Sequence, residues 1–226
     1  MNEALDNPVY HALWTGDTHL ASGTDNVKYF DEEISPFAGF DEVYRSGFDD
    51  LHDLLPAGRK VLYATRKKIR EPNKWELLHE IEGLQFVYER EPDTYSNDKN
   101  LISLCKQHAE EMVQLAALTK PGPFNLRTIE FGNYFGVFQD DRLVAMAGQR
   151  LHAGNYSEIS AVCTHPEYLG RGFAAALIGH QLCLIRDQHK IPFLHVRADN
   201  SRAIALYERL GFKKNGPMNF YVLNRS

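Results

Sequence analysis

The sequence contains few cysteines and no long apolar run. Its three cysteines, Cys105, Cys163 and Cys183, include no C-x-x-C pair, and such a set predicts neither a disulfide framework nor a zinc ribbon. No stretch approaches the length of apolar chain that a transmembrane helix needs, and residues 1–20 lack the basic and apolar segments of a signal peptide. These absences predict a cytoplasmic protein with no membrane partner and no metal.

Positive charge is also in short supply. The chain carries 25 Lys and Arg against 30 Asp and Glu, a net charge of −5, whereas a surface that binds nucleic acid needs a basic face. The basic cluster at residues 66–70 is followed directly by Glu71 and Pro72, and we interpret it as a solvated turn. The composition therefore predicts a globular protein without a nucleic-acid partner.

The spacing of apolar and turn-forming residues predicts an α/β protein. In the first part of the chain, residues 48–55 have helical periodicity and residues 60–65 are rich in strand-forming residues. Beyond residue 83 we predict the order strand, helix, β-hairpin, strand, helix, strand, helix, strand. The corresponding ranges are 83–90, 104–119, 134–151, 156–164, 170–189, 191–198, 200–211 and one or two short strands from 212, with a loop at 91–98. We therefore divide the chain into an N-terminal α/β region, residues 1–83, and a second domain, residues 84–226.

A glycine-rich loop separates the strand at 156–164 from the helix that follows it. Gly170, Gly172 and Ala175 match G-x-G-x-x-A, the fingerprint of dinucleotide-binding folds. However, residues 165–169 separate the loop from its strand, and too little chain follows Asp199 for the remaining strands of a doubly wound sheet. The glycines still let an anion approach a helix N-terminus, whose unpaired N–H groups attract phosphate. The loop thus predicts a phosphate site for a ligand other than a dinucleotide.

This loop resembles the pyrophosphate loop of the GNAT superfamily of acyl-CoA-dependent N-acyltransferases, Q/R-x-x-G-x-G/A. The register runs here from Leu169 to Ala174, and Leu169 departs from the Gln or Arg of the family. Residues 200–212, NSRAIALYERLGF, resemble a second family signature, N-x-x-A-x-x-L-Y-x-x-x-G-F. The element order from residue 83 also matches that family. The resemblance implies a GNAT-type mixed, mostly antiparallel sheet flanked by helices, here with an additional N-terminal α/β region.

The resemblance further implies acetyl-CoA as co-substrate, with no metal. In this family the strand at 161–164 separates from the strand at 193–196, and the pantetheine arm lies in the gap. The residues expected to bind acetyl-CoA are Val162, Cys163, Thr164, Leu169, Gly170, Arg171, Gly172, Phe173, Ala174 and Asn200. Most of this contact is expected from backbone groups. Phe173 is expected to anchor its helix in the core and Asn200 to cap the next helix, while Arg171 either adds a charged contact or faces solvent.

Aminolysis of a thioester requires a proton to leave the amine, an oxyanion to be stabilised and the departing thiolate to be protonated. The resemblance makes Tyr207 the candidate acid and Glu158 the candidate base. We expect apolar neighbours to raise the pKa of Glu158 toward neutrality. The structural alternatives, a core tyrosine and a surface glutamate, stay open. The oxyanion is assigned to a backbone N–H near Val162, and an acyl-enzyme on Cys163 lacks an evident His/Asp relay.

We therefore predict an N-acetyltransferase that transfers an acetyl group from acetyl-CoA to an amine by direct attack in a ternary complex. The acceptor is a small-molecule or peptide amine that the sequence does not identify. The alternative, favoured by the departure at Leu169, is a catalytically silent GNAT-fold module that binds CoA as a sensor or interaction surface. The length of the chain and the sequence of its glycine-rich loop resemble those of the glycine N-acyltransferase-like branch of the superfamily. Residues 1–83 act either as a scaffold or homodimer contact or in acceptor selection.

Overall fold

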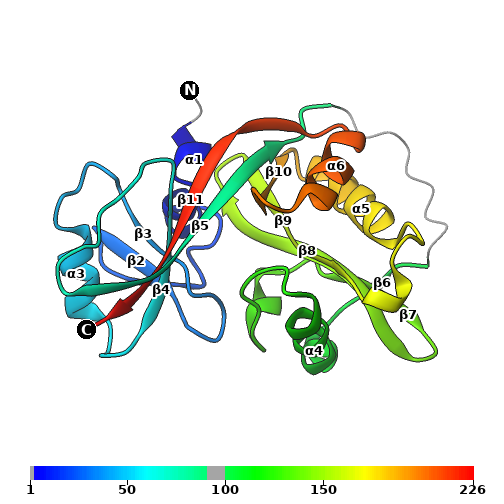
Figure 1. The fold of residues 1–226 in the computed structure, drawn as a ribbon, viewed down its shortest axis with the longest axis horizontal. Coiled ribbons are helices and arrows are strands. Elements are labelled where there is room, and N and C mark those ends of the chain that lie inside the picture. Colours follow the sequence, from blue (N-terminus) through cyan, green and yellow to red (C-terminus); the bar gives the residue numbers. More distant parts are fainter. Residues whose placement is uncertain (1–2, 91–99) are drawn as a thin grey trace.

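A computed structural model describes residues 3–90 and 100–226, so the loop predicted at 91–98 lies outside the described residues. At its centre is an eight-stranded sheet with the order β4-β11-β5-β10-β9-β8-β7-β6 (Figure 1). Its strands are β4 (Lys60–Thr65), β5 (Trp75–Val87), β6 (Ile102–Ser103), β7 (Phe135–Gln139), β8 (Arg142–Ala153), β9 (Tyr156–Thr164), β10 (Ile191–Arg197) and β11 (Lys213–Arg225). Within this sheet β9 and β10 pair in parallel and the other neighbours are antiparallel. The predicted mixed, mostly antiparallel sheet flanked by helices is confirmed.

Helices cover both faces of the sheet. They are α1 (Glu3–Asp6), α2 (Pro8–Trp14), α3 (Gly47–Leu54), α4 (Ala109–Thr119), α5 (Phe173–Asp187) and α6 (Ser201–Arg209). Helices α2 and α4 share a hydrophobic cluster with Met146 and Phe193 of the sheet, while α5 and α6 pack with Ile159 and Leu194 on the opposite face. Neighbours such as Phe193 and Leu194 enter different clusters because successive strand residues point to opposite faces. No helix among the described residues is long and apolar enough to cross a membrane.

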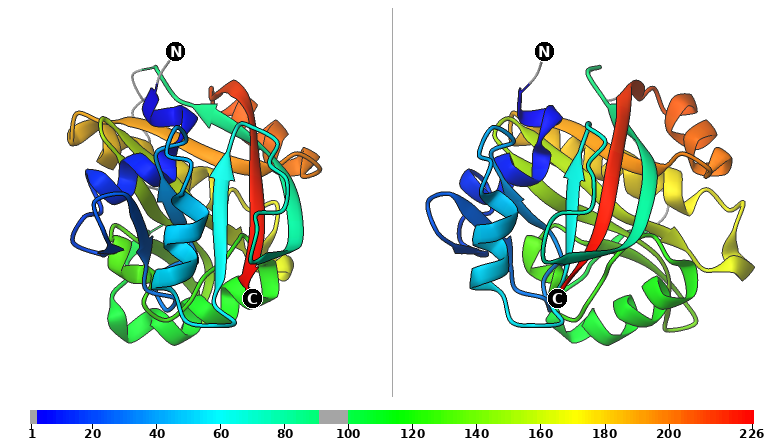
Figure 2. Two further views of the ribbon diagram at one scale, coloured as in Figure 1. Left: turned by 90° about the vertical axis from the view of Figure 1, so that its left-hand side faces the viewer. Right: turned by 60° about the vertical axis from the view of Figure 1, so that its left-hand side comes forward.

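Residues before β4 form a smaller α/β layer beside the large sheet (Figure 2). Its sheet has the order β1-β2-β3, with β1 (Ala21–Gly23), β2 (Val27–Phe30) and β3 (Ala38–Phe40). Leu13 and Phe30 of this layer belong to the same hydrophobic cluster as Met146 of the large sheet. The boundary predicted between residues 83 and 84 falls inside β5, which runs through both positions. The two regions therefore share one sheet and one core.

Two helices begin later than the sequence pattern predicts. Helix α5 begins at Phe173 rather than at residue 170, because Gly170 and Gly172 have positive φ angles of 80° and 81°, which a right-handed helix excludes. Helix α4 begins at Ala109, because Cys105 is still extended and a 3₁₀ turn follows it. The glycine loop is therefore an ordered turn that ends where the helix starts.

The two long strands β5 and β11 extend further than predicted. β5 begins at Trp75 rather than at residue 83, and β11 is one strand of 13 residues rather than one or two short ones. A register shift between Lys214 and Gly216 accommodates the Gly-Pro pair that interrupts the sequence pattern. Exposed charged residues such as Glu80 lie along β5, so regular alternation of apolar residues does not mark it. Within the large sheet the two strands run side by side along their whole length (Figure 1).

Candidate active site

A cleft with a volume of about 830 Å³ opens along β9, between the start of α5, helix α6 and the end of α4. It lies where β9 and β10 separate, since their pairing covers only Tyr156 to Glu158 with Ile191 to Phe193. Beyond the pair Glu158 and Phe193, the backbones of β9 and β10 are no longer paired. The gap expected between the two strands is therefore present.

The strand that lines the gap contains a β-bulge. Gly148 of β8 faces Ser160, whereas Met146 faces Cys163, so β9 holds an extra residue between these pairs. Ala161 within the bulge has a φ of 53°, a left-handed conformation that is uncommon for a residue with a side chain. A bulge disrupts the ladder and leaves a backbone group unpaired. The bulge at Ala161 lies immediately before Val162, the first residue of β9 that lines the cleft.

Most of the residues predicted from the sequence line this one cleft. They are Val162, Cys163, Thr164, Leu169, Gly170, Gly172, Phe173, Ala174, Asn200 and Tyr207. Arg171 is exposed at the rim, with its guanidinium 4.7 Å from the ring centroid of Tyr168. Glu158 lies outside the lining, at the closed end of the gap. The fold thus joins the glycine loop to the second signature, which the sequence separates.

The start of α5 lines the cleft and is a candidate anion site. Gly172 is the N-cap residue and no side chain caps this end, although the first N–H groups of a helix have no acceptors inside it. The helix dipole adds positive potential at the same end. A Cβ atom placed on Gly170 would meet nothing within 4 Å, so glycine is needed here for its positive φ rather than for packing. Backbone groups therefore face open space where an anion fits.

Two polar side chains extend the cleft beyond the anion site. The Thr164 hydroxyl oxygen is buried and has no hydrogen-bond partner among the described residues, which is unusual for a buried polar atom. Asn200 caps α6 as predicted, because its side chain accepts from the N–H of Ala203 at 3.1 Å. Both residues line the cleft, so the lining next to the strand gap is polar as well as apolar.

Tyr207 of α6 presents a phenol to this cleft. The residue is 7 % exposed, and its ring packs near Phe86 and Phe212. Burial raises the pKa of Tyr207 to about 12, with further contributions from negative charge at Cys163 and Glu158. The phenol is therefore protonated at neutral pH and available as a donor.

Glu158 is buried, with 1 % of its surface exposed, but the expectation of a raised pKa is wrong. Arg150 donates to both carboxylate oxygens at 2.9 and 3.1 Å, and Nδ1 of His195 lies 2.8 Å from Oε1. Burial opposes ionisation, but the charge of Arg150 and the hydrogen bond from His195 outweigh it and lower the pKa to about 2. Glu158 is thus a carboxylate held in a buried ion pair.

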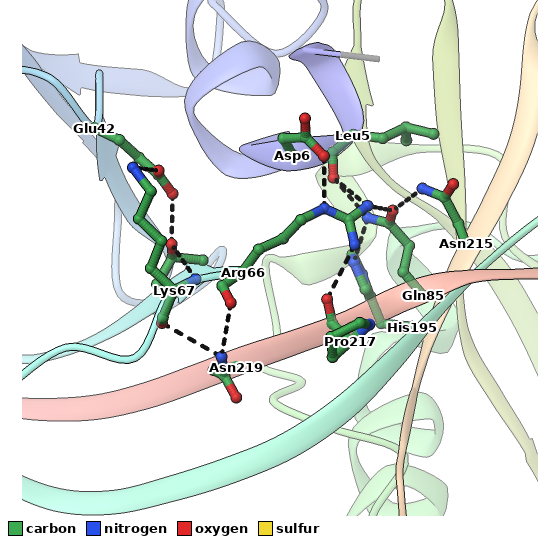
Figure 3. Close-up of polar contacts among 11 residues, drawn as sticks. Leu5, Asp6, Glu42, Arg66, Lys67, Gln85, His195, Asn215, Pro217 and Asn219 are labelled. Atoms are coloured by element: carbon green, nitrogen blue, oxygen red, sulfur yellow. Dashed lines mark hydrogen bonds and ion pairs between the residues drawn. The ribbon is translucent and has the colours of Figure 1, made fainter. Parts of the chain in front are cut away.

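The partners of Glu158 were missed from the sequence. Arg150 faces Glu158 across the β8–β9 hairpin, but a register shift between Arg150 and His152 precedes this pair, so counting residues outward from the hairpin turn would have placed Leu151 opposite Glu158. His195 lies on β10, and beyond it Gln85 and Arg66 continue the hydrogen-bonded chain toward the N-terminal region (Figure 3). No local spacing links these residues, because they come from separate strands and a loop of the N-terminal region.

Two further properties bear on the chemistry of this site: the protonation of the Cys163 thiol and the arrangement of side chains that could bind a metal ion. Burial raises the pKa of the Cys163 thiol to about 11, so the thiol is protonated at neutral pH, and the thiolate is the nucleophilic form. Among residues 3–90 and 100–226, no group of three or more His, Cys, Asp or Glu is placed to hold a metal ion.

The chain is similar to a known protein family and to proteins of known structure. A family model described as FR47-like protein matches residues 134–221, a range that contains the cleft-lining strand and both motifs. The crystal structure of a candidate acetyltransferase of the GNAT family from Novosphingobium aromaticivorans is 32% identical, covers 98% of each chain and has a TM-score of 0.91. This similarity extends over the N-terminal region as well as over the cleft.

Two further proteins resemble the chain less completely. Spermidine N(1)-acetyltransferase of Vibrio cholerae is 38% identical over 79 residues, which cover 31% of this chain and 45% of that protein. The aligned chain thus spans less than half of this curated relative. A GCN5-related N-acetyltransferase from Kribbella flavida has a TM-score of 0.62 over 95% of this chain and 93% of its own, but only 13% identity. That likeness concerns the fold alone.

Proposed function

Since this chain belongs to the GNAT family of acetyltransferases, we propose that it transfers the acetyl group of acetyl-CoA to an amine. One observation carries the proposal: a single cleft combines the uncapped helix start at Gly172, the unpartnered hydroxyl of Thr164 and the protonated phenol of Tyr207. A thioester with a pyrophosphate tail needs an anion site, polar strand groups and a proton donor in this arrangement.

The residues present fit acetyl-CoA, which supplies the activated acyl group and the leaving thiolate when it is bound. The N–H groups at the start of α5 would hold the pyrophosphate, and Gly170 and Gly172 would let it approach the backbone. Val162 and Thr164 lie on β9 past the point of separation from β10, where the pantetheine arm would pair with them. The Thr164 hydroxyl would then gain the partner that it lacks.

Tyr207 is assigned the proton that the departing sulfur requires. Its raised pKa keeps the phenol protonated at neutral pH, and donation from a positioned acid lowers the barrier to departure of the thiolate. A backbone N–H of the bulge near Val162 would stabilise negative charge on the thioester oxygen, since a donor held rigidly needs no reorganisation.

Glu158 is better suited to hold charge than to accept a proton. Arg150 and His195 occupy both of its oxygens, and its lowered pKa makes it a weak base. We therefore assign it an electrostatic and positioning role at the closed end of the gap. Removal of the proton from the amine is assigned to solvent water in the cleft.

Direct attack by the amine in a ternary complex is favoured over an acyl-enzyme. Cys163 is the cysteine that lines the cleft, and its raised pKa leaves the thiol protonated. An acyl-enzyme would need the thiolate, whereas direct attack needs only the bound thioester and a neutral amine.

The acceptor is proposed as an amine of a small molecule or peptide. A similar protein is named for spermidine, so polyamines belong in the first test together with amino acids and short peptides. The silent CoA-binding module remains the competing function, and it predicts binding of CoA without transfer to any amine.

The test is a panel of these amines with acetyl-CoA, followed by release of free thiol and by mass spectrometry of the product. Reactions without amine measure hydrolysis, and calorimetry measures binding of CoA. We expect thiol release that depends on one class of amine, together with an acetylated product. Binding of CoA without transfer would support the silent module, and absence of binding would overturn the proposal.

A further inference from the structure

The side-chain amide of Gln85 uses all of its hydrogen-bonding positions. Its Oε1 accepts from Nη2 of Arg66 at 2.6 Å and from Nδ2 of Asn215 at 2.7 Å. Its Nε2 donates to the carbonyl oxygen of Leu5 at 3.0 Å and lies 3.0 Å from Nε2 of His195 (Figure 3). An amide offers two acceptor positions and two N–H groups. Because Gln85 is fully buried, reversing the amide would lose several hydrogen bonds at once.

This fixed amide determines which nitrogen of His195 carries the proton. Gln85 presents an N–H to Nε2 of His195, so Nε2 must offer its lone pair. The proton then lies on Nδ1, which donates to Oε1 of Glu158 at 2.8 Å. If His195 were an imidazolium, its Nε2–H would point at the N–H of Gln85, and neither group could accept a hydrogen bond. The other neutral tautomer would do the same and would also place a lone pair against the Glu158 carboxylate.

The tautomer sets the charge at the closed end of the gap. Arg150 of β8 faces Glu158 of β9 in an ion pair, and a neutral His195 on β10 adds no charge to it. Beyond Gln85, Arg66 is paired with Asp6 at 2.6 Å. Each of the two arginines in this row thus has one carboxylate partner, Glu158 at the buried end and Asp6 at the partly exposed end, and the row carries no net charge.

The closed end of the gap is electrostatically coupled to the proposed acid. Negative charge on Glu158 contributes to the raised pKa of Tyr207, after burial and the effect of Cys163. An imidazolium at His195 would add an uncompensated positive charge next to Glu158 and oppose this contribution. The same charge would also repel an incoming ammonium group. A neutral His195 is therefore the state that suits both the acid and the acceptor.

We propose that Gln85 is a positioning residue, which holds His195 as the neutral Nδ1–H tautomer and so sets the charge at the closed end of the gap. Its effect on acetyl transfer rests on the proposed function. Leu5 and Arg66 orient Gln85 from the N-terminal region, so this region contributes to the electrostatics of the site as well as to the core.

The first test is ¹⁵N NMR of the histidine rings in the full chain. In the wild type we expect His195 near neutral pH with a protonated Nδ1 and an unprotonated Nε2. Gln85→Glu would supply an acceptor to Nε2, so we expect imidazolium signals for His195 at the same pH. An Nε2–H tautomer or an imidazolium in the wild type would overturn the proposal.

The second test is kinetic, with Gln85→Leu and the matched variant Gln149→Leu. Gln149 is also a fully buried sheet glutamine, but its amide bonds Gln181, Asn133 and Ser157, and the histidine beside it, at 3.4 Å, is His152 instead of His195. We expect Gln85→Leu to lower kcat/KM for the amine about tenfold, the size of one lost hydrogen bond, to leave KM for acetyl-CoA unchanged and to introduce a loss of rate on mild acidification.

Gln149→Leu should lower the melting temperature without this acid-dependent loss and without a change in the His195 signals. Equal pH profiles for the two variants would reduce Gln85 to a structural residue and overturn its role. If the wild type transfers no acetyl group while its NMR spectrum shows the expected tautomer, the proposed function fails together with the catalytic effect of Gln85, and the control of His195 stands.

Discussion

Tyr207 and Glu158 show how two buried side chains near one site acquire pKa values that are shifted in opposite directions. Burial raises the pKa of Tyr207 to about 12. Burial also opposes ionisation of Glu158, but Arg150 and His195 outweigh it and the pKa falls to about 2. The difference arises from the partners, because a neighbouring charge or donor can exceed the cost of desolvation.

Replacing Tyr207 with Phe should remove the proton donor and leave the cleft intact. We expect kcat to fall about 100-fold, as for loss of a general acid, with little change in the Kd for CoA measured by calorimetry. Because the pKa of Tyr207 is raised, its ionisation should cause no loss of the wild-type rate until the pH approaches 12. Tyr63→Phe changes another buried tyrosine in a cluster away from the cleft and is the control. An unchanged kcat in Tyr207→Phe would exclude this role.

Replacing Glu158 with Gln should destabilise the fold. Loss of one partner from a buried ion pair costs about 3 kcal/mol, to be measured by urea unfolding near neutral pH. The folded-state pKa is lowered, so the stability contributed by Glu158 is present above the unfolded value of about 4.5 and is lost as the pH falls toward 2. The difference between wild type and Glu158→Gln should therefore shrink on acidification.

The control for this prediction is Glu82→Gln, which alters an exposed carboxylate paired with Lys68. An exposed pair contributes at most about 1 kcal/mol, so this variant should unfold nearly as the wild type does. A Glu158→Gln protein as stable as the wild type at neutral pH would contradict the ion-pair assignment. A difference that grows on acidification would contradict the direction of the pKa shift.

At the scale of elements, the turn into α5 combines positive φ angles at two glycines with the proposed site for the pyrophosphate. Gly170→Ala would place a side chain on a residue with a φ of 80°, at a cost of about 1 kcal/mol. The added methyl group would also occupy the open space beside the helix start. We expect the Kd for CoA to rise about tenfold, measured by calorimetry, alongside this modest loss of stability.

Gly58→Ala offers a matched control for the turn. Gly58 has a φ of 76°, and a Cβ atom there also meets nothing within 4 Å, but it lies between α3 and β4, and the cleft lining does not include it. The two variants should lose similar stability, and only Gly170→Ala should weaken binding of CoA. Equal affinities would show that this loop does not contact the ligand.

Elements formed by local signals were predicted well. The strand at 60–65 and the strand at 156–164 have the predicted bounds, because alternation and flanking turn residues mark them. β5 was predicted too short, since its charged outer half is stabilised by pairing with β11 rather than by an apolar face of its own. The start of α5 was misplaced because a sequence does not record the sign of φ at Gly170.

At the scale of the whole molecule, the shared core predicts that residues 84–226 do not fold alone. This fragment would lack β4, most of β5 and buried residues such as Leu13, Phe30 and Phe37. Each such side chain contributes about 1.5–3 kcal/mol by burial, and total stabilities are only about 5–15 kcal/mol. We expect no cooperative thermal transition by circular dichroism, in contrast to the full chain. A cooperative transition in the fragment would support the boundary predicted at residue 83.

The sequence by itself determined most elements of the large sheet, the glycine loop, the capped helix at Asn200 and the family resemblance, because these depend on neighbours along the chain. The tertiary structure decided what lies opposite each strand. Arg150 and His195 reach Glu158 from the two strands on either side of β9, Gln85 reaches His195 from the next strand of the sheet, and Arg66 reaches Gln85 from the N-terminal region. The charge state of a buried group depends on these non-local partners, and no spacing along one chain records them.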